Sequence, residues 1–140
     1  MIIRTAWLYS EFGSNYVKTM LRLADEREEI NVVSDQIGSP TYAGDLAHAI
    51  HLIIKHENWQ PGIYHFTDEG VASWYDFTKA IFDITGKKTK VNAIRTSQYP
   101  TPAKRPLYSV LSKNKIKRNY GLEIPYWRDS LKRCLEQMGV

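Results

Sequence analysis

Apolar residues recur along the chain at two spacings, which predict strands alternating with helices. Short runs rich in apolar and β-branched residues predict strands over 2–8, 30–34, 62–66 and 89–94. Apolar positions spaced three and four residues apart predict amphipathic helices between and after these strands. Their stripes are Val17, Met20, Leu21 and Ala24; Leu46, Ala49, Ile50, Ile53 and Ile54; Phe77, Ala80, Ile81 and Ile84; and Trp127, Leu131, Cys134, Leu135 and Met138. This alternating order is typical of an α/β fold.

The predicted helices also carry residues that mark their ends. Ser14 or Asn15 can cap the first helix, and Ser73 with Asp76 resembles a capping box in which Asp replaces Glu. The other predicted ends are Asp45 for the start of the second helix, Gly86 for the end of the third, and Ser112 and Gly121 for the two ends of a short basic helix before the last one.

The composition fits one folded domain. A chain of 140 residues, 43% hydrophobic and 24% charged, is long enough to bury a core. No run of roughly eighteen apolar residues predicts a membrane span, and the N-terminus lacks the pattern of a signal peptide. The single cysteine, Cys134, excludes an internal disulfide and favours a reducing cytoplasm. The net charge of +4 suits an anionic ligand, but it is too dispersed to predict a nucleic-acid-binding surface.

Motifs for nucleotide and hydrolytic chemistry are missing. The chain contains no G-x-G-x-x-G, no G-x-x-x-x-G-K-[ST] and no G-x-S-x-G. His48 and His51 have the i, i+3 spacing of two metal ligands, but no Cys, Asp or Glu completes a site, so no metal is expected. Cys134 falls on the apolar stripe of the last helix and is predicted to be a core thiol rather than a nucleophile. The residues alone therefore indicate no catalytic constellation.

Two loops and one tryptophan have the chemistry of a binding site. The loop DQIGSPTYAGD at 35–45 contains Gln36, which can donate and accept hydrogen bonds, and Gly38, which leaves room for a close ligand. The proline-rich loop YPTPAKRPLYS holds Arg105, whose guanidinium suits a diphosphate; the alternative is a rigid surface connection with an exposed arginine. Trp7 has a flat face suited to a sugar or a base, although its position also suits a core residue.

Taken in order, the sequence blocks resemble one family, the dTDP-4-dehydrorhamnose reductases of the extended short-chain dehydrogenase/reductase type. The combination of D-Q-x-G-x-P-T, S-W-Y-x-F and A-K-R-P is specific, whereas each block alone would be weak. The matching blocks are RTAWLY at 4–9, GSNYVKTMLRLADERE at 13–28, VVSDQIGSPTYAGDLA at 32–47, GIYHFTDEGVASWYDFTKAIF at 62–82, TPAKRPLYSVLSKNKI at 101–116 and YGLEIPYWRDSLKRCL at 120–135. The resemblance covers essentially the whole chain.

The resemblance also implies which part of such a reductase the chain corresponds to. In that family the segment like RTAWLY is a late strand of the nucleotide-binding domain. The glycine-rich NAD(P) loop and the Tyr-x-x-x-Lys catalytic pair lie upstream of it, and we expect neither in this chain. Residues 1–140 are thus expected to be a single domain, the C-terminal substrate-binding portion plus the last strand or strands of a Rossmann-type domain. No catalytic residue, no tight binding of NADPH or NADH and no reductase activity are expected of the chain alone.

Several positions carry a site role over from the family. Trp7 would pack against the sugar of a dTDP-sugar, and Arg105 would reach the substrate phosphates. The remaining positions are Asn15 and Tyr16 beside the nucleotide, Gln36, Pro40 and Thr41 near the substrate cleft, and the backbone of Leu8 near the nicotinamide. Ser10 departs from the glycine expected after the Trp7 strand.

The implied function is the last step of dTDP-L-rhamnose formation, in which a hydride from NADPH or NADH reduces the C4 ketone of dTDP-4-dehydro-L-rhamnose. Two alternatives remain: a non-catalytic module related to the regulatory subunit of methionine adenosyltransferase, and a portion of a nucleotide-sugar epimerase. Trp7 argues against the epimerase, because those enzymes usually carry Asn there. The strand at 2–8 would have unpaired edges, so self-association as a homodimer or by strand exchange is expected.

Overall fold

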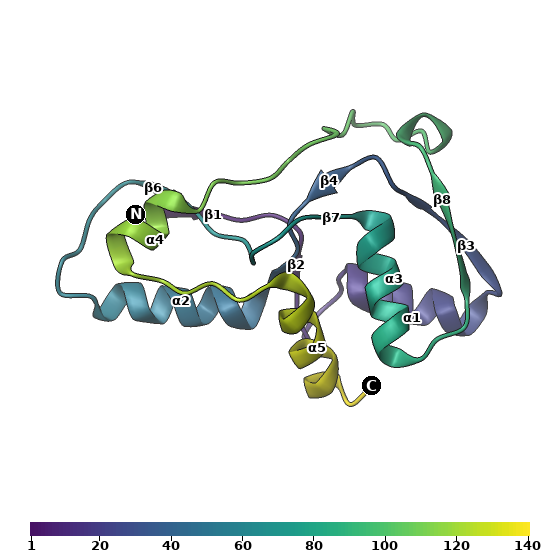
Figure 1. The fold of residues 1–140 in the computed structure, drawn as a ribbon, viewed down its shortest axis with the longest axis horizontal. Coiled ribbons are helices and arrows are strands. Elements are labelled where there is room, and N and C mark those ends of the chain that lie inside the picture. Colours follow the sequence, from purple (N-terminus) through teal and green to yellow (C-terminus); the bar gives the residue numbers. More distant parts are fainter.

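The computed structural model describes all 140 residues as a mixture of helices and short strands (Figure 1). The helices are α1 (Tyr16–Glu26), α2 (Ala43–Lys55), α3 (Trp74–Thr85), α4 (Asn114–Tyr120), α5 (Trp127–Met138) and the short 3-10 helix η1 (Thr96–Gln98). The strands are β1 (Ile2–Arg4), β2 (Leu8–Tyr9), β3 (Glu29–Val33), β4 (Ile37–Gly38), β5 (Thr41–Tyr42), β6 (Ile63–His65), β7 (Ala72–Ser73) and β8 (Lys90–Ile94).

The strands pair two by two. β1 pairs with β6, β2 with β5 and β3 with β8, each pair parallel, while β4 pairs antiparallel with β7. Parallel strands need a long connection, and here α2 lies between β1 and β6 in the chain and α3 lies between β3 and β8. The predicted α/β class is therefore confirmed.

Buried apolar side chains form two clusters, one toward each end of the molecule. The larger joins α1, α3, α5 and β3 and includes Phe77 and Leu131, both 0% exposed. The smaller joins α2, β6 and α4 and includes Ile53 and Ile116. In Figure 1, α2, α4 and β6 lie toward one end of the long axis and α1, α3 and β3 toward the other, while α5 and the short strands β2, β4 and β7 lie between them. The middle of the molecule is thus where irregular segments from both ends come together.

Most predicted helix ends agree with the structure. The Asn15 side chain accepts a hydrogen bond from the Lys18 N–H and caps α1, which settles the choice between Ser14 and Asn15. Ser73 and Asp76 form the predicted capping box at the start of α3. Gly86 and Gly121 end α3 and α4 in the left-handed conformation. The prediction for the start of α4 was wrong: its N-cap is Lys113, which makes no side-chain cap bond, rather than Ser112.

The predicted strand over 2–8 is broken in two. β1 ends at Arg4 and β2 begins at Leu8, because the chain turns at Trp7, whose φ of 50° is the only positive value at a non-glycine residue. The segment 35–45, expected to be a loop, contains β4 and β5 and the start of α2 at Ala43. These two-residue strands have too few positions to show an alternating pattern in the sequence.

The stripe predicted for α2 includes two residues that are not buried. Ala49 and Ile53 lie in the core, but Ile50 is 38% exposed and Ile54 is 69% exposed. The helix therefore buries only the part of its apolar surface that faces β6 and α4. No helix has both the length and the apolar character that crossing a bilayer requires.

Candidate functional site

A groove of about 1230 Å³ is lined by residues of α1 and β3. Its floor is apolar and includes Met20 and Leu23 of α1 and Ile30 and Val32 of β3. The opposite wall is the irregular segment from Gln98 to Ser109, and aromatic rings line the part near the middle of the molecule. A cleft lined mainly by apolar side chains with a few polar groups is the usual form of a small-molecule site.

The aromatic end of the groove is a stack of indole rings. Trp7 and Trp74 lie with ring centroids 3.6 Å apart and planes 10° from parallel. Tyr16 packs against Trp74 at 4.5 Å between centroids. Trp74 has no role in the sequence-based prediction, where S-W-Y-x-F served only to mark a helix start and a family block. Nothing in the sequence indicates that Trp74 meets a tryptophan so far away in the chain.

Gly38 packs against the Trp7 ring and not against a ligand. A Cβ at Gly38 would lie 2.6 Å from Cε2 of Trp7, closer than atoms can approach. The prediction that the missing side chain of Gly38 leaves room for a ligand is therefore wrong, because the indole of Trp7 fills that space.

Thr41 fixes the backbone that carries Trp7. The Thr41 N–H donates to the carbonyl of Trp7 at 3.0 Å, and its hydroxyl donates to the carbonyl of Ala6 at 2.7 Å. Thr41 is 0% exposed, and neighbouring Pro40 is buried and accepts a hydrogen bond from the Asp68 N–H through its carbonyl. Both residues lie behind the groove wall rather than on its surface.

Asn15 and Tyr16 occupy the start of α1. The Asn15 side chain is engaged in capping α1 and donates to the carbonyl of Ser10 at 2.7 Å. The Tyr16 hydroxyl lies 2.6 Å from the hydroxyl of Thr78, and burial raises the pKa of Tyr16 to about 12, against the opposing effect of the Thr78 hydrogen bond. Tyr16 lines the groove with its ring, whereas Asn15 does not line it.

Gln36 lies at the rim, where β3 and β8 end. Its amide donates to the hydroxyl of Thr96 at 3.2 Å, and the carboxylate of Asp35 accepts from the backbone and the hydroxyl of Thr96 at 2.8 and 2.6 Å. These hydrogen bonds from Thr96 hold the pKa of the Asp35 carboxyl below its usual value. The network holds η1 against the loop after β3 and leaves the Gln36 carbonyl oxygen without a protein donor.

Arg105 contributes a positive charge on the opposite wall. It is exposed, lines the groove and makes no ion pair, and Lys104 beside it does not line the groove. Arg27 and Glu29 also line the groove, at the end away from the indole stack, where Glu29 pairs with Lys90 at 3.6 Å.

The groove thus brings together four of the predicted site residues, Trp7, Tyr16, Gln36 and Arg105. The other four, Leu8, Asn15, Pro40 and Thr41, are not among its lining residues. The backbone of Leu8 pairs with β5, and its side chain is 49% exposed. Their roles toward a ligand stay predictions.

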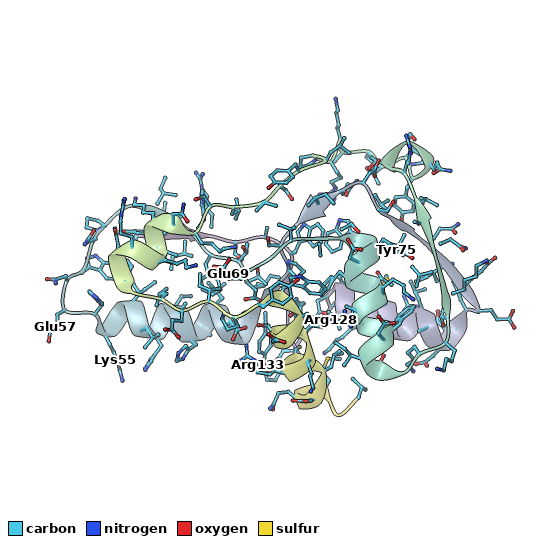
Figure 2. The ribbon with its side chains drawn as sticks, viewed as in Figure 1. Lys55, Glu57, Glu69, Tyr75, Arg128 and Arg133 are labelled. Atoms are coloured by element: carbon cyan, nitrogen blue, oxygen red, sulfur yellow. The ribbon has the colours of Figure 1, made fainter.

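The spacing Tyr-x-x-x-Lys occurs once in the chain, although not in the context expected of the family's catalytic pair. Tyr75 and Lys79 have it on α3, and Figure 2 shows Tyr75 on that helix. Lys79 lies 3.9 Å from Asp83 across an exposed i, i+4 pair, and neither Tyr75 nor Lys79 lines the groove. This pair is therefore not placed to donate a proton to a ligand there.

The chain lacks the backbone turn that typically holds the pyrophosphate of a nicotinamide dinucleotide. Such a turn is glycine-rich so that the backbone can approach the pyrophosphate, and the 140 residues contain none. His48 and His51 are exposed on α2, and no three metal-binding side chains converge anywhere in the chain.

The fold is shared with known nucleotide-sugar enzymes. The chain is similar to the dTDP-4-dehydrorhamnose reductase of Bacillus anthracis, solved in complex with NADP, with a TM-score of 0.89 and 43% identity over 97% of this chain and 47% of that one. It is also similar in fold to the UDP-glucuronic acid 4-epimerase of Bacillus cereus, with a TM-score of 0.75 and 14% identity over 99% of this chain and 44% of that one. The chain therefore has the fold of about half of an extended short-chain dehydrogenase/reductase.

The sequence comparison narrows this class to one family. Residues 1–140 match the RmlD substrate binding domain, and the chain belongs to that family. The dTDP-4-dehydrorhamnose reductase of Aggregatibacter actinomycetemcomitans is 47% identical over 94% of this chain and 48% of its own length. The chain spans about half the length of the curated relatives it matches. The resemblance seen in the sequence blocks is thus confirmed.

Proposed function

We propose that the groove binds a dTDP-sugar and that the chain is the substrate-binding part of an NAD(P)H-dependent reductase that converts dTDP-4-dehydro-L-rhamnose to dTDP-L-rhamnose. The observation that carries the proposal is the convergence of Trp7, Tyr16, Gln36 and Arg105 from four segments onto one groove. The relatives named above as dTDP-4-dehydrorhamnose reductases support the choice of substrate.

The groove offers one kind of chemistry to each part of such a ligand. Arg105, a planar fork of donors without a competing carboxylate, suits the diphosphate. The apolar floor of α1 and β3 suits the methylated pyrimidine ring, and Gln36 offers an amide to its polar edge or to the sugar. The aromatic end is left for the sugar. The chain would thereby fix the position of the C4 ketone, which is a large part of catalysis when two reactants must meet.

The hydride and the proton would come from outside this groove. NADPH or NADH supplies the hydride in the proposed reaction, and we propose that a separate stretch of polypeptide holds that cofactor and the catalytic Tyr and Lys. A free edge of β1, which pairs only with β6, is available for such a partner. We expect the 140-residue chain to bind nicotinamide cofactor weakly and to show no turnover; measurable reduction by the purified chain would contradict this.

Calorimetric titration with dTDP, thymidine and dTDP-glucose tests the binding proposal. The chain should bind dTDP more tightly than thymidine, and Arg105→Gln should weaken dTDP about tenfold, as expected for the loss of charged hydrogen bonds. Thymidine binding should not change in this variant. Lys104→Gln is the matched control, because it removes the neighbouring charge outside the groove. Equal affinity for dTDP and thymidine, or binding of none of the three, would refute the proposal.

Self-association and a cytoplasmic location complete the proposal. Ile2 of β1 is 59% exposed and Leu8 of β2 is 49% exposed, and both lie on strands with an unpaired edge. The isolated chain should therefore dimerise or form larger species in light scattering, and Ile2→Lys should reduce this. A monomer at high concentration would count against self-association.

A cytoplasmic location is also part of the proposal, because the unpaired, buried Cys134 suits a reducing compartment.

A further inference from the structure

The indole of Trp7 is covered on both faces. Trp74 covers one face at 3.6 Å between ring centroids. On Gly38, a Cβ would lie 2.6 Å from Cε2 of Trp7, 2.8 Å from Cζ2 and 2.9 Å from Nε1. Cε2 is bonded to both Cζ2 and Nε1. If the Cβ approached Trp7 in the plane of the ring, Cζ2 or Nε1 would be nearer to it than Cε2, which is not the case. Gly38 therefore lies over the ring, and it must lie on the face that Trp74 leaves free.

This sandwich limits how a ligand can touch Trp7. The sequence predicts a flat aromatic face of Trp7 for a sugar, but the structure leaves only the edges of the Trp7 ring open to the groove. Neither Trp7 nor Trp74 donates an indole N–H to a protein acceptor, and neither N–H is among the buried polar atoms without a partner, so both reach solvent. An accessible indole edge with its N–H is suited to a sugar oxygen.

Trp74 is itself held from behind. It is the first residue of α3, whose capping box is formed by Ser73 and Asp76. Tyr16 packs on the Trp74 ring, and its hydroxyl lies 3.4 Å from the Trp74 carbonyl and 2.6 Å from Thr78. Trp7 has the opposite character, since its backbone adopts a φ of 50° that costs energy for a bulky residue and is kept only when its surroundings impose it. The rigid partner in the pair is Trp74.

We infer that Trp74 is a positioning residue for sugar recognition: by stacking on Trp7 it holds that indole edge-on to the groove, at the place where the sugar of the bound nucleotide sugar lies. The inference rests on the proposed function, because it needs a dTDP-sugar in the groove. It assigns a role to a residue of α3, which is far in sequence from every residue predicted to contact the ligand.

Two variants test whether Trp74 acts through its stacked ring or only through the volume of its side chain. Trp74→Leu removes the stacked ring but keeps an apolar side chain, and it should weaken dTDP-glucose about three- to tenfold while leaving dTDP unchanged. Trp74→Phe keeps a flat ring and should restore most of the affinity. In the double variant with Trp7→Leu, the loss should be no greater than with Trp7→Leu alone, since Trp74 acts through Trp7. Trp59→Leu, at an indole that is 51% exposed and outside the groove, is the matched control.

Circular dichroism supplies a readout that a merely structural role would not change. Two indoles stacked at 3.6 Å couple and give a paired positive and negative band in the far ultraviolet, which either Trp7→Leu or Trp74→Leu should abolish and Trp59→Leu should not. In the unaltered chain, dTDP-glucose should change this band pair and dTDP should not, so the test holds even if Trp74→Leu does not fold.

The outcomes distinguish the two proposals. If the unaltered chain binds neither dTDP nor dTDP-glucose, the proposed function fails and the role of Trp74 fails with it. If it binds both, but Trp74→Leu weakens them equally or not at all, or the losses at Trp7 and Trp74 add, only the positioning role is overturned. If dTDP-glucose binds and the band pair stays unchanged, the positioning role of Trp74 is overturned as well.

Discussion

Replacing Asp68 by Asn should stabilise the folded chain more at about pH 8 than at about pH 5. Asp68 follows β6 and is 0% exposed; its Oδ2 accepts from the Tyr42 N–H at 2.9 Å, and its Oδ1 has no partner. Burial raises the pKa of Asp68 to about 7, with Asp45 adding to the rise, while the Tyr42 hydrogen bond, Arg133 and Lys113 oppose it.

The direction and size of the expected change in stability follow from the difference in the pKa of Asp68 between the folded and the unfolded chain. The unfolded carboxyl keeps its ordinary pKa of 3.8, so as pH rises the unfolded chain loses this proton first. The stability that the protonated Asp68 confers is complete below that value, declines by about 1.4 kcal/mol per pH unit, and is lost above about pH 7. Between pH 5 and pH 8 the loss is about 2 to 3 kcal/mol. Asn cannot ionise and still accepts from Tyr42, so the variant escapes this loss.

Urea unfolding of both proteins at the two pH values measures the effect. The informative quantity is the change in the free energy of unfolding between the two pH values, because a fixed cost of burying the Asn amide cancels in it. Asp83→Asn removes an exposed carboxylate and controls for net charge. If Asp68→Asn changes stability by the same amount at both pH values, the carboxyl is ionised in the folded chain and the reasoning is wrong.

Three further outcomes follow from the packing. Gly38→Ala places a methyl 2.6 Å from Cε2 of Trp7 and should destabilise the chain by about 1 to 3 kcal/mol in urea while reducing the indole band pair; an unaltered band pair would contradict the contact. Thr41→Val removes the hydrogen bond to Ala6 and should lower the free energy of unfolding by about 1 to 3 kcal/mol, whereas Thr41→Ser keeps the hydroxyl and should lose only the contribution of one buried methyl, about 0.8 kcal/mol. Burial raises the pKa of Cys134 to about 12, so a disulfide reagent at pH 8 should react only after unfolding; fast reaction of the native chain would refute this.

The regular part of the fold was predictable because it follows from periodicity. Phe77, Ala80 and Ile81 fall three and four residues apart and are all buried in α3, where Ser73 also forms the expected cap. The weaker result for α2, where Ile54 is 69% exposed, has a physical cause. A stripe records which face is apolar, but it does not record how much of that face the neighbouring elements cover.

The polar groups of the groove were predictable only one by one, without their arrangement relative to one another. The two loop sequences predict Gln36 and Arg105 as binding residues, and both line the groove. Their proximity depends on η1 and on the pairing of the segment around Tyr108 with β4, where the Ile37 N–H donates to the Leu107 carbonyl at 2.8 Å. Such pairing joins residues about 70 apart and leaves no local signal in the sequence. The family resemblance supplied what the spacing could not.

The arrangement around Trp7 shows why this part of the site could not be predicted from the residues next to it in the sequence. Apolar residues over 2–8 indicate a single strand, and a single strand would send Trp7 to one face of a sheet. The chain instead turns there, because Thr41 holds the carbonyls of Ala6 and Trp7 from the neighbouring strand and Gly38 has no side chain to obstruct the indole. The two hydrogen bonds of Thr41 and the absence of a side chain at Gly38 all come from the segment 38–41. The shape of the sugar end of the groove is therefore set by residues that do not line it. A substitution in that segment should therefore alter ligand affinity without touching the ligand.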